Sequence, residues 1–325
     1  MLRALNLFQF LGYSAARVRN KKVNMFKNII MLALFVHVLP AHAAEIEGAN
    51  AVVRDDQLSS AVFNRAAAPR LQSAFAMIYD EQDQRPLYSK NADAVVPIAS
   101  ITKLMTAMVI LDANLPMDEP ISIESEDRDR LKGSRSRMRN GMTLTRGELL
   151  KLALMASENQ AAAALARTYP GGTQVALAMM NAKARELGLS STRFYDPTGL
   201  HSDNVSTARE LVKIVMAAQS YDLIHQYSTS HSHTVNVEGR RSLRFSNTNP
   251  LVRSATWDIG LSKTGYISEA GRCLVMQAKI LNRPVVIVLL DSWGKRTRVG
   301  DANRVKQWME NAVARSLRQA SHRIN

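Results

Sequence analysis

Apolar residues recur every three or four positions in three central stretches of the chain, a spacing that predicts three buried helices. The first begins at Ser100, and the second follows Thr145, which forms a capping-box pattern with Glu148 three positions later. The second helix is expected to end at Ser157, and a third to cover residues 161–166. The apolar positions of the first helix are Leu104, Met105, Met108, Val109 and Leu111.

Shorter apolar runs on either side of these helices predict strands. A strand at residues 75–80 and a short partner near Leu87 precede the helices, and the sheet is expected to resume near His233. This order predicts an α/β protein of the α+β kind, in which an antiparallel sheet is flanked by helices and carries an inserted all-α lobe, with a cleft between the two. Later strands are expected at residues 257–262, 272–281 and 284–291, and a terminal helix from about Asp301.

Ser100 and Lys103 form the first candidate for catalysis. Residues three apart share a helix face, so the lysine amine can accept the serine proton as the hydroxyl attacks a carbonyl. The backbone N–H of Ser100, in the first helical turn, can stabilise the resulting oxyanion. This task requires a lowered pKa at Lys103, which burial and a second cation such as Lys263 would supply. Taken alone, the pair could equally be a capping serine and an exposed lysine.

A second polar group, Ser157-Glu158-Asn159, stands where one predicted helix ends and the next begins. Side chains at such a junction can project into a cleft between helices. Ser157 could then relay a proton between Lys103 and a leaving amine, and Asn159 could hydrogen-bond a substrate amide. Glu158 is interpreted as a solvated surface residue, and simple helix capping is the alternative for the whole group.

The third group, Lys263-Thr264-Gly265, follows the predicted strand at residues 257–262. An edge strand beside a nucleophilic serine can bind substrate by main-chain pairing, while a cation fixes a substrate carboxylate. Gly265 would keep the strand surface open. A lysine in a strand is usually solvated, so this interpretation depends on the other two motifs.

Together the three motifs stand in the order used by active-site serine, penicillin-recognising enzymes. On this basis the chain resembles the low-molecular-mass penicillin-binding proteins, which are serine D-alanyl-D-alanine peptidases, across essentially its whole expected mature length. Within that family it is most similar to the D-alanyl-D-alanine endopeptidase branch, of the penicillin-binding protein 7 type. The supporting stretches are residues 97–107, 157–163, 196–200 and 261–266.

The resemblance implies a DD-peptidase/β-lactamase-like fold and a role for each matched residue. Ser100 would form the acyl-enzyme with Lys103 as its proton acceptor, and Ser157 and Asn159 would line the cleft. The implied reaction is hydrolysis of D-alanyl–meso-diaminopimelate cross-links in peptidoglycan. A D-alanyl-D-alanine carboxypeptidase, and a wall protein that binds β-lactams without turnover, are the alternatives.

The same resemblance assigns the substrate-binding residues. Lys263 and Thr264 would bind the substrate carboxylate, and the Tyr266 N–H would be the second oxyanion donor. Glu158 stands where many relatives have Gly or Asp, and its side chain is expected to point away. The expected partners are peptidoglycan peptides, with β-lactam antibiotics as covalent inhibitors. No cofactor is implied.

Two absences refine this expectation. Between Ser157 and Lys263 no glutamate stands in a loop motif suited to positioning a deacylating water, so a penicilloyl adduct should be hydrolysed slowly. The 60 residues after Gly265 suffice for two strands and a helix, so no C-terminal β domain is expected.

The first 43 residues have the pattern of a secretory signal peptide, with basic residues, an apolar run at 29–39 and a small-x-small site ending at Ala43. Met25 is a plausible true start. The apolar run is shorter than the about 20 residues that span a bilayer, so a periplasmic protein without a stable membrane anchor is expected. A loosely ordered lead-in at residues 44–70 would then precede a catalytic domain at residues 71–325.

Charge and composition narrow the function further. The formal net charge is +14, and loss of the signal peptide would leave 36 basic against 28 acidic residues. This moderate basicity suits an anionic wall or substrate carboxylates, and without an aromatic-interleaved patch it does not indicate nucleic-acid binding. The arginine-rich stretch at residues 128–146 is expected to be a mixed solvated surface. Cys273 is expected to be buried, and His231 and His233 lack a third metal ligand nearby, so no metal site is predicted.

Overall fold

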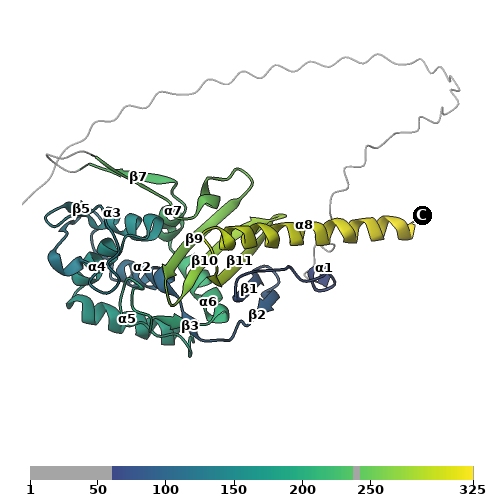
Figure 1. Ribbon diagram of the computed structural model, residues 1–325, viewed down its shortest axis with the longest axis horizontal. Helices are drawn as coiled ribbons and strands as arrows, with labels where there is room; N and C mark the ends of the chain where they lie inside the picture. Colours follow the sequence, from purple (N-terminus) through teal and green to yellow (C-terminus); the bar gives the residue numbers. More distant parts are fainter. Residues whose placement is uncertain (1–60, 237–241, 325) are drawn as a thin grey trace, which may run out of the picture. The chain divides into compact units, whose positions relative to one another are not determined.

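A five-stranded antiparallel sheet crosses the computed structural model, which describes residues 61–236 and 242–324 (Figure 1). Its strand order is β2-β1-β11-β10-β9, so two strands from before the helices pair with three from after them. This arrangement confirms the predicted antiparallel sheet. The strands are β1 (Phe75–Asp80), β2 (Arg85–Lys90), β9 (Asp258–Ile267), β10 (Gly271–Ile280) and β11 (Arg283–Ser292).

Both faces of the sheet are covered, which explains the continuous apolar run of β11. Successive strand residues point to opposite faces. Val286 and Val288 pack with the inserted helices, whereas Val285 and Ile287 pack with the long terminal helix α8 (Thr297–Ile324). Helix α6 (Ala208–Ala218) lies against β1, β10 and β11 on the face opposite α8.

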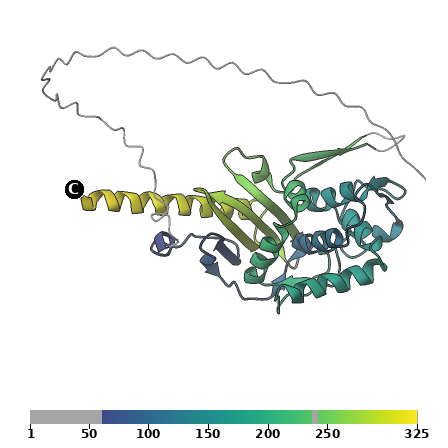
Figure 2. The same ribbon diagram turned by 180° about the vertical axis from the view of Figure 1, so that it is seen from behind.

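The residues between β2 and β9 are mainly helical and form the inserted lobe (Figure 2). The predicted capping box is present: the Thr145 hydroxyl accepts a hydrogen bond from the Glu148 N–H, and the Glu148 carboxylate accepts one from the Thr145 N–H. Besides α6, the helices of this lobe are α2 (Lys103–Asp112), α3 (Arg146–Lys151), which the capping box begins, α4 (Asn159–Arg167), α5 (Gly172–Glu186) and α7 (Asp222–Ser228).

The sheet does not resume near His233, which corrects the sequence-based expectation. His233 lies in β7 (Ser232–Val235), which pairs only with β8 (Leu243–Ser246) as a separate hairpin. The physical reason is composition: a strand rich in Ser, His and Thr cannot fill a position that is buried on both faces. Two further strand pairs are β3 (Val96–Pro97) with β6 (Val205–Ser206), and β4 (Pro120–Ser122) with β5 (Thr143–Thr145).

The predictions for the N-terminal segment fall largely outside the described residues, including the signal peptide at residues 1–43. Within the segment expected to be loosely ordered, the structure places the short helix α1 (Ala61–Asn64). Its Phe63 is buried against the Trp308 ring of α8, at a centroid distance of 5.9 Å. Loose order therefore does not extend over α1. Among the described helices, none is long and apolar enough to cross a membrane.

The arginine-rich stretch at residues 128–146 is only partly the solvated surface expected. Arg128, Arg135 and Arg139 are exposed, but Arg146 is buried with its Nη2 2.5 Å from the Glu119 Oε2. Arg146 is the first residue of α3, and its guanidinium also donates to the Thr168 hydroxyl. These polar partners offset the free-energy cost of burying its charge.

The buried ion pair between Arg283 and Asp80 yields a first prediction. The Arg283 Nη2 and Nε lie 2.5 and 2.8 Å from the Asp80 Oδ2, and both residues are almost fully buried where β11 begins. Replacing Asp80 by Ala removes this carboxylate from a buried guanidinium, while the pair with Asp83 remains. We expect Asp80→Ala to lower the free energy of unfolding by about 3 kcal/mol, measured by urea denaturation.

The control for this prediction is Asp93→Ala, which breaks the solvent-exposed pair between Asp93 and Arg209. Exposed pairs contribute little, so its urea midpoint should stay close to that of the wild type. Equal effects of the two substitutions would contradict a special contribution from the buried pair.

Candidate active site

Ser100 and Lys103 lie together at the start of α2, as the sequence predicts. Ser100 belongs to a 3₁₀ turn, η2 (Ala99–Thr102), that runs directly into α2. In a 3₁₀ turn the side chains at positions i and i+3 eclipse each other, which aligns the two residues. The Lys103 Nζ is 2.9 Å from the Ser100 Oγ, and both side chains are buried.

The backbone before the nucleophile is held in an unusual conformation. Ala99 has a φ of 47°, a left-handed value that costs energy for a residue with a Cβ. Two contacts hold it there. The Thr102 hydroxyl donates to the Ala99 carbonyl at 2.8 Å, and Gly199 packs so closely that a Cβ on it would overlap that carbonyl.

The loop at residues 196–201 supplies a functional group that the candidate list from the sequence omits. The Asp196 carboxylate accepts hydrogen bonds from the backbone N–H groups of Thr198, Gly199 and His201, which fixes the loop. The loop thereby presents the Thr198 carbonyl to the Lys103 Nζ, at 2.6 Å. The sequence could have indicated this loop, because residues 196–199 are Asp-Pro-Thr-Gly, which is typical of a turn.

Burial determines the protonation of Lys103. It lowers the pKa of Lys103 to about 7, although the carboxylates of Asp196, Glu158 and Asp129 act in the opposite direction. A substantial neutral fraction at neutral pH is what a general base requires. The sequence also predicts a contribution from Lys263. Lys263 is itself buried, which lowers its pKa well below its usual value, and the charges of Lys103 and Arg298 add to that shift.

Ser157 contacts Lys263 rather than Lys103. Ser157 ends a π-helical turn at residues 152–156 and has a left-handed φ of 60°. Its Oγ accepts a hydrogen bond from the Lys263 Nζ at 2.7 Å, and that amine also donates to the Thr264 carbonyl. A hydroxyl next to a buried amine of lowered pKa can pass a proton in either direction, so the predicted relay acquires Lys263 as its neighbour.

Asn159 joins the catalytic lysine to the arginine-rich loop. Its Oδ1 accepts from the Lys103 Nζ at 2.7 Å, and its Nδ2 donates to the Ser134 hydroxyl at 2.8 Å. Both ends of the amide are therefore engaged. The Nδ2 carries a second N–H, which remains able to donate to a substrate carbonyl.

Glu158 is not the solvated surface residue that the sequence suggested. It is half-buried, its Oε2 accepts from the Ser136 hydroxyl at 2.8 Å, and burial raises the pKa of its carboxyl. The reason is the fold of the loop at residues 128–140, which covers the start of α4 and which no local pattern indicated.

The edge strand β9 lies directly against η2. A Cβ on Gly265 would stand 3.0 Å from the Ser100 N and 3.0 Å from the Ile98 carbonyl, so the glycine permits this approach. The Thr264 hydroxyl donates to the Thr248 hydroxyl at 2.7 Å and is buried. Tyr266, two residues on, is exposed, and its ring packs under the Arg272 guanidinium.

Arg298 is a further candidate that the sequence analysis missed. It is the second residue of α8, and its Nη1 is buried without a hydrogen-bond partner among the described residues. Its positive charge contributes to the lowered pKa of Lys263. An unpaired buried guanidinium atom can bind a carboxylate oxygen. No local motif marks this position, because Arg298 joins the site only through the packing of α8 on the sheet.

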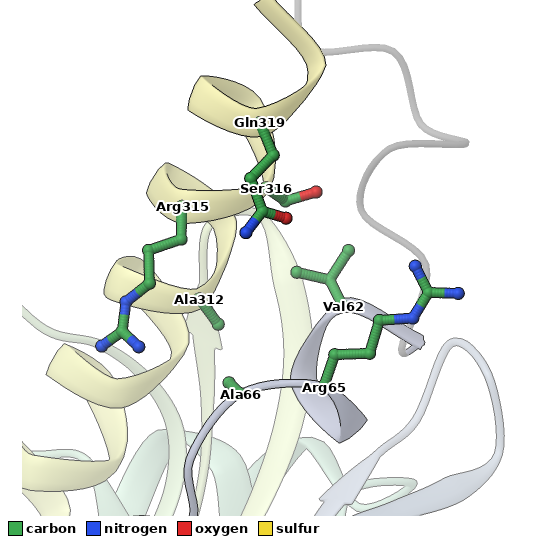
Figure 3. A pocket seen from close by; sticks show the side chains of 7 residues that line it. All are labelled: Val62, Arg65, Ala66, Ala312, Arg315, Ser316 and Gln319. Atoms are coloured by element: carbon green, nitrogen blue, oxygen red, sulfur yellow. The ribbon is translucent and has the colours of Figure 1, made fainter. Parts of the chain in front are cut away.

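Of two hollows in the described part of the protein, one adjoins these residues and the other lies apart from them. One, of about 370 Å³, is bordered by Asn159 and Thr198 and by the loop at residues 126–131, so it adjoins the catalytic lysine. The other, of about 190 Å³, lies between α1 and α8 and contains none of the catalytic candidates (Figure 3). Cys273 is buried as expected, and burial raises the pKa of its thiol to about 11.

The assembled site has the parts needed for acyl transfer. It combines the Ser100 hydroxyl beside the Lys103 amine, whose pKa is lowered, with the Ser100 N–H at the start of a helix. It also holds the Lys263 amine beside the Ser157 hydroxyl. The cations Lys263 and Arg298 suit a substrate carboxylate. His231 and His233 take no part, since His233 is half-buried with its Nε2 3.6 Å from the Glu148 Oε1.

Comparison with known proteins agrees with this chemistry. The sequence model of the S11 peptidase family, described as D-alanyl-D-alanine carboxypeptidase, matches residues 62–294. A D-alanyl-D-alanine endopeptidase of Pseudomonas aeruginosa is 46% identical over 252 residues, which is 77% of this chain and 81% of that protein. The crystal structure of the Streptomyces K15 DD-transpeptidase is similar with a TM-score of 0.70 and 28% identity, covering 75% of this chain and 99% of that one. Penicillin-binding protein D2 of Listeria monocytogenes, in its cefotaxime-bound form, is similar with a TM-score of 0.66 and 26% identity, at the same coverage.

The close approach of Gly199 to the nucleophile yields a second prediction. Gly199→Ala should displace the Ala99–Ser100 peptide and lower the rate of acylation by a β-lactam about a hundredfold, because small misplacements of reacting groups are costly. Gly141→Ala is the matched control, since Gly141 has a similar φ of 78° but no neighbouring atom within 4 Å of the added carbon. It should retain the acylation rate. A normal rate in Gly199→Ala would show that the contact does not position Ser100.

The lowered pKa of Lys103 yields a third prediction. Only the neutral amine accepts the serine proton, so the rate constant of acylation should fall about tenfold per pH unit below about pH 7 and level off above it. Stopped-flow acylation by a chromogenic β-lactam measures this profile, with Ser100→Ala as the blank for hydrolysis in solution. A rate that does not change between about pH 5 and 9 would contradict Lys103 as the base.

Proposed function

Because the chain belongs to the S11 family of serine D-alanyl-D-alanine peptidases, we propose that it is an endopeptidase that hydrolyses D-alanyl–meso-diaminopimelate cross-links of peptidoglycan. The observation that carries the proposal is the contact between the Lys103 Nζ and the Ser100 Oγ, at 2.9 Å, in a chain 46% identical to a named endopeptidase. β-Lactams would acylate the same serine.

The first half of the reaction uses Ser100 and Lys103. The Ser100 Oγ attacks the carbonyl carbon of the D-alanyl residue, and its proton passes to the neutral Lys103 amine. Asn159 and the Thr198 carbonyl hold that amine in place, and both stabilise it once it is charged. The N–H groups of Ser100 and Tyr266 would stabilise the oxyanion.

The second half uses the neighbouring pair. The leaving amine of diaminopimelate needs a proton as the bond breaks, and the Ser157 hydroxyl, bound to Lys263, is placed to deliver it. Thr264, Lys263 and Arg298 would together bind the carboxylate next to the scissile bond. A water molecule then attacks the ester carbonyl of the acyl-enzyme: its proton passes to the Ser157–Lys263 pair, the bond to the Ser100 Oγ breaks, and the proton on Lys103 returns to that oxygen.

The location of the protein follows from the substrate. We infer that residues 1–43 direct secretion and that the enzyme acts in the periplasm, where peptidoglycan lies. The moderate basicity of the expected mature chain would favour contact with the anionic wall.

The decisive test compares two substrates, and it gives the fourth prediction. Purified enzyme should convert dimeric muropeptides to monomers faster than it releases D-alanine from soluble pentapeptides, as resolved by chromatography and mass spectrometry. Ser100→Ala should lose both this activity and covalent labelling by a fluorescent penicillin. Release of D-alanine while the dimers persist would make the enzyme a carboxypeptidase, and labelling without turnover of either substrate would make it a binding protein.

A further inference from the structure

A hollow beside the catalytic cleft has no role in the mechanism above. It has a volume of about 540 Å³ and is formed mainly by the loop at residues 128–140. We call it the arginine basin, and the residues that define it are Arg128, Arg135, Arg139, Met138 and Gln160.

The arginine basin carries net positive charge, because three guanidinium groups and one carboxylate line it. Arg128, Arg135 and Arg139 are exposed, and none has an ion pair or side-chain hydrogen bond within residues 61–236 and 242–324. Asp129 is the acidic residue that lines the basin, but its carboxylate already accepts from the backbone N–H groups of Leu131, Lys132 and Ser134. Three guanidinium groups are therefore available to an anion.

The floor of the basin contains an unpaired polar group. Gln160 is 8% exposed and lines the hollow, and its Oε1 has no donor among the described residues. A buried acceptor without a donor is unfavourable, and rotation of the amide would let a ligand N–H supply one. Guanidinium groups and an amide acceptor that line one hollow suit a ligand that carries a carboxylate next to an N–H.

The basin is fixed relative to the catalytic lysine. Ser134 and Ser136 of its loop hydrogen-bond Asn159 and Glu158, and Asn159 in turn binds Lys103. On the other side of the loop the Lys132 Nζ lies 2.5 Å from the carboxylate of Glu269, in the turn between β9 and β10. The loop thus spans from the helical lobe to the sheet.

The basin also adjoins the cleft. Arg128 and Asp129 line both the basin and the hollow of about 370 Å³ beside the catalytic lysine, and Gln160 directly follows Asn159. A long substrate bound at Ser100 can therefore extend into it.

We propose that the arginine basin binds a free carboxylate, next to an N–H, of the cross-linked peptide at a position away from the scissile bond. This inference rests on the proposed function and extends it, because it makes the basin the part of the site that distinguishes a cross-linked peptide from a short one. A small substrate or a β-lactam would occupy the cleft without reaching the basin.

The fifth prediction tests this with the double variant Arg135→Ala/Arg139→Ala. Its KM for dimeric muropeptides should rise about tenfold with little change in kcat, because one or two charge-assisted hydrogen bonds are lost. The same variant should be acylated by a small penicillin at the wild-type rate. Dimers in which one carboxylate at a time is amidated identify the group that the basin binds. When that group is the amidated one, the wild type and the variant should have the same KM.

The matched control is Arg315→Ala/Arg318→Ala, which removes the same charge from exposed positions of α8 and should leave the KM unchanged. Binding of intact dimer to a Ser100→Ala protein, with and without the basin substitutions, measures the basin without turnover. A wild-type enzyme that binds dimers but does not cleave them would refute only the proposed function. The proposal that the basin is a carboxylate site would be overturned if dimer affinity were equal with and without the substitutions. An equal loss of affinity for every amidated dimer would overturn it too, and so would a parallel loss of penicillin acylation.

Discussion

The hydrogen bonds of the Lys103 amine are the interaction on which the site depends. This one buried nitrogen contacts the Ser100 hydroxyl, the Asn159 amide oxygen and the Thr198 carbonyl, which come from three separate parts of the chain. Burying a lysine costs free energy unless its polar partners are supplied, and the same burial lowers its pKa to about 7. Folding of the helical lobe around Lys103 therefore lowers the pKa of its amine, which is what the proposed base requires.

Close backbone approach is the second requirement, and two glycines meet it. Gly199 and Gly265 both lie against the Ala99–Ser100 peptide, and a side chain at either position would crowd that peptide. Because β9 belongs to the sheet and η2 leads into α2 of the lobe, Ser100 lies where the sheet and the lobe meet. The strained φ of Ala99 persists because its surroundings determine it.

Whether a feature could be predicted from the sequence depends on how close in the chain its interacting residues are. Ser100 and Lys103 are one turn apart, so their contact could be predicted from spacing, as could the Thr145–Glu148 capping box and the strand at residues 75–80. Arg298 and Glu158 could not be placed, because one depends on the packing of α8 and the other on the path of a loop. His233 was misassigned for a related reason, since its alternating pattern fits a hairpin as well as a sheet.

The distribution of charge explains why such a site suits an anionic polymer. Lys103 and Lys263 are both buried, and their mutual repulsion favours at most one positive charge in the free enzyme. A substrate carboxylate near Lys263 and Arg298 would place that single charge on Lys263 and hold this lysine protonated, ready to supply a proton through Ser157. Substrate binding would then set the protonation of the site: Lys103 stays neutral to accept a proton, while Lys263 becomes charged to donate one. The two lysines of similar burial thus acquire opposite roles from the position of a single carboxylate.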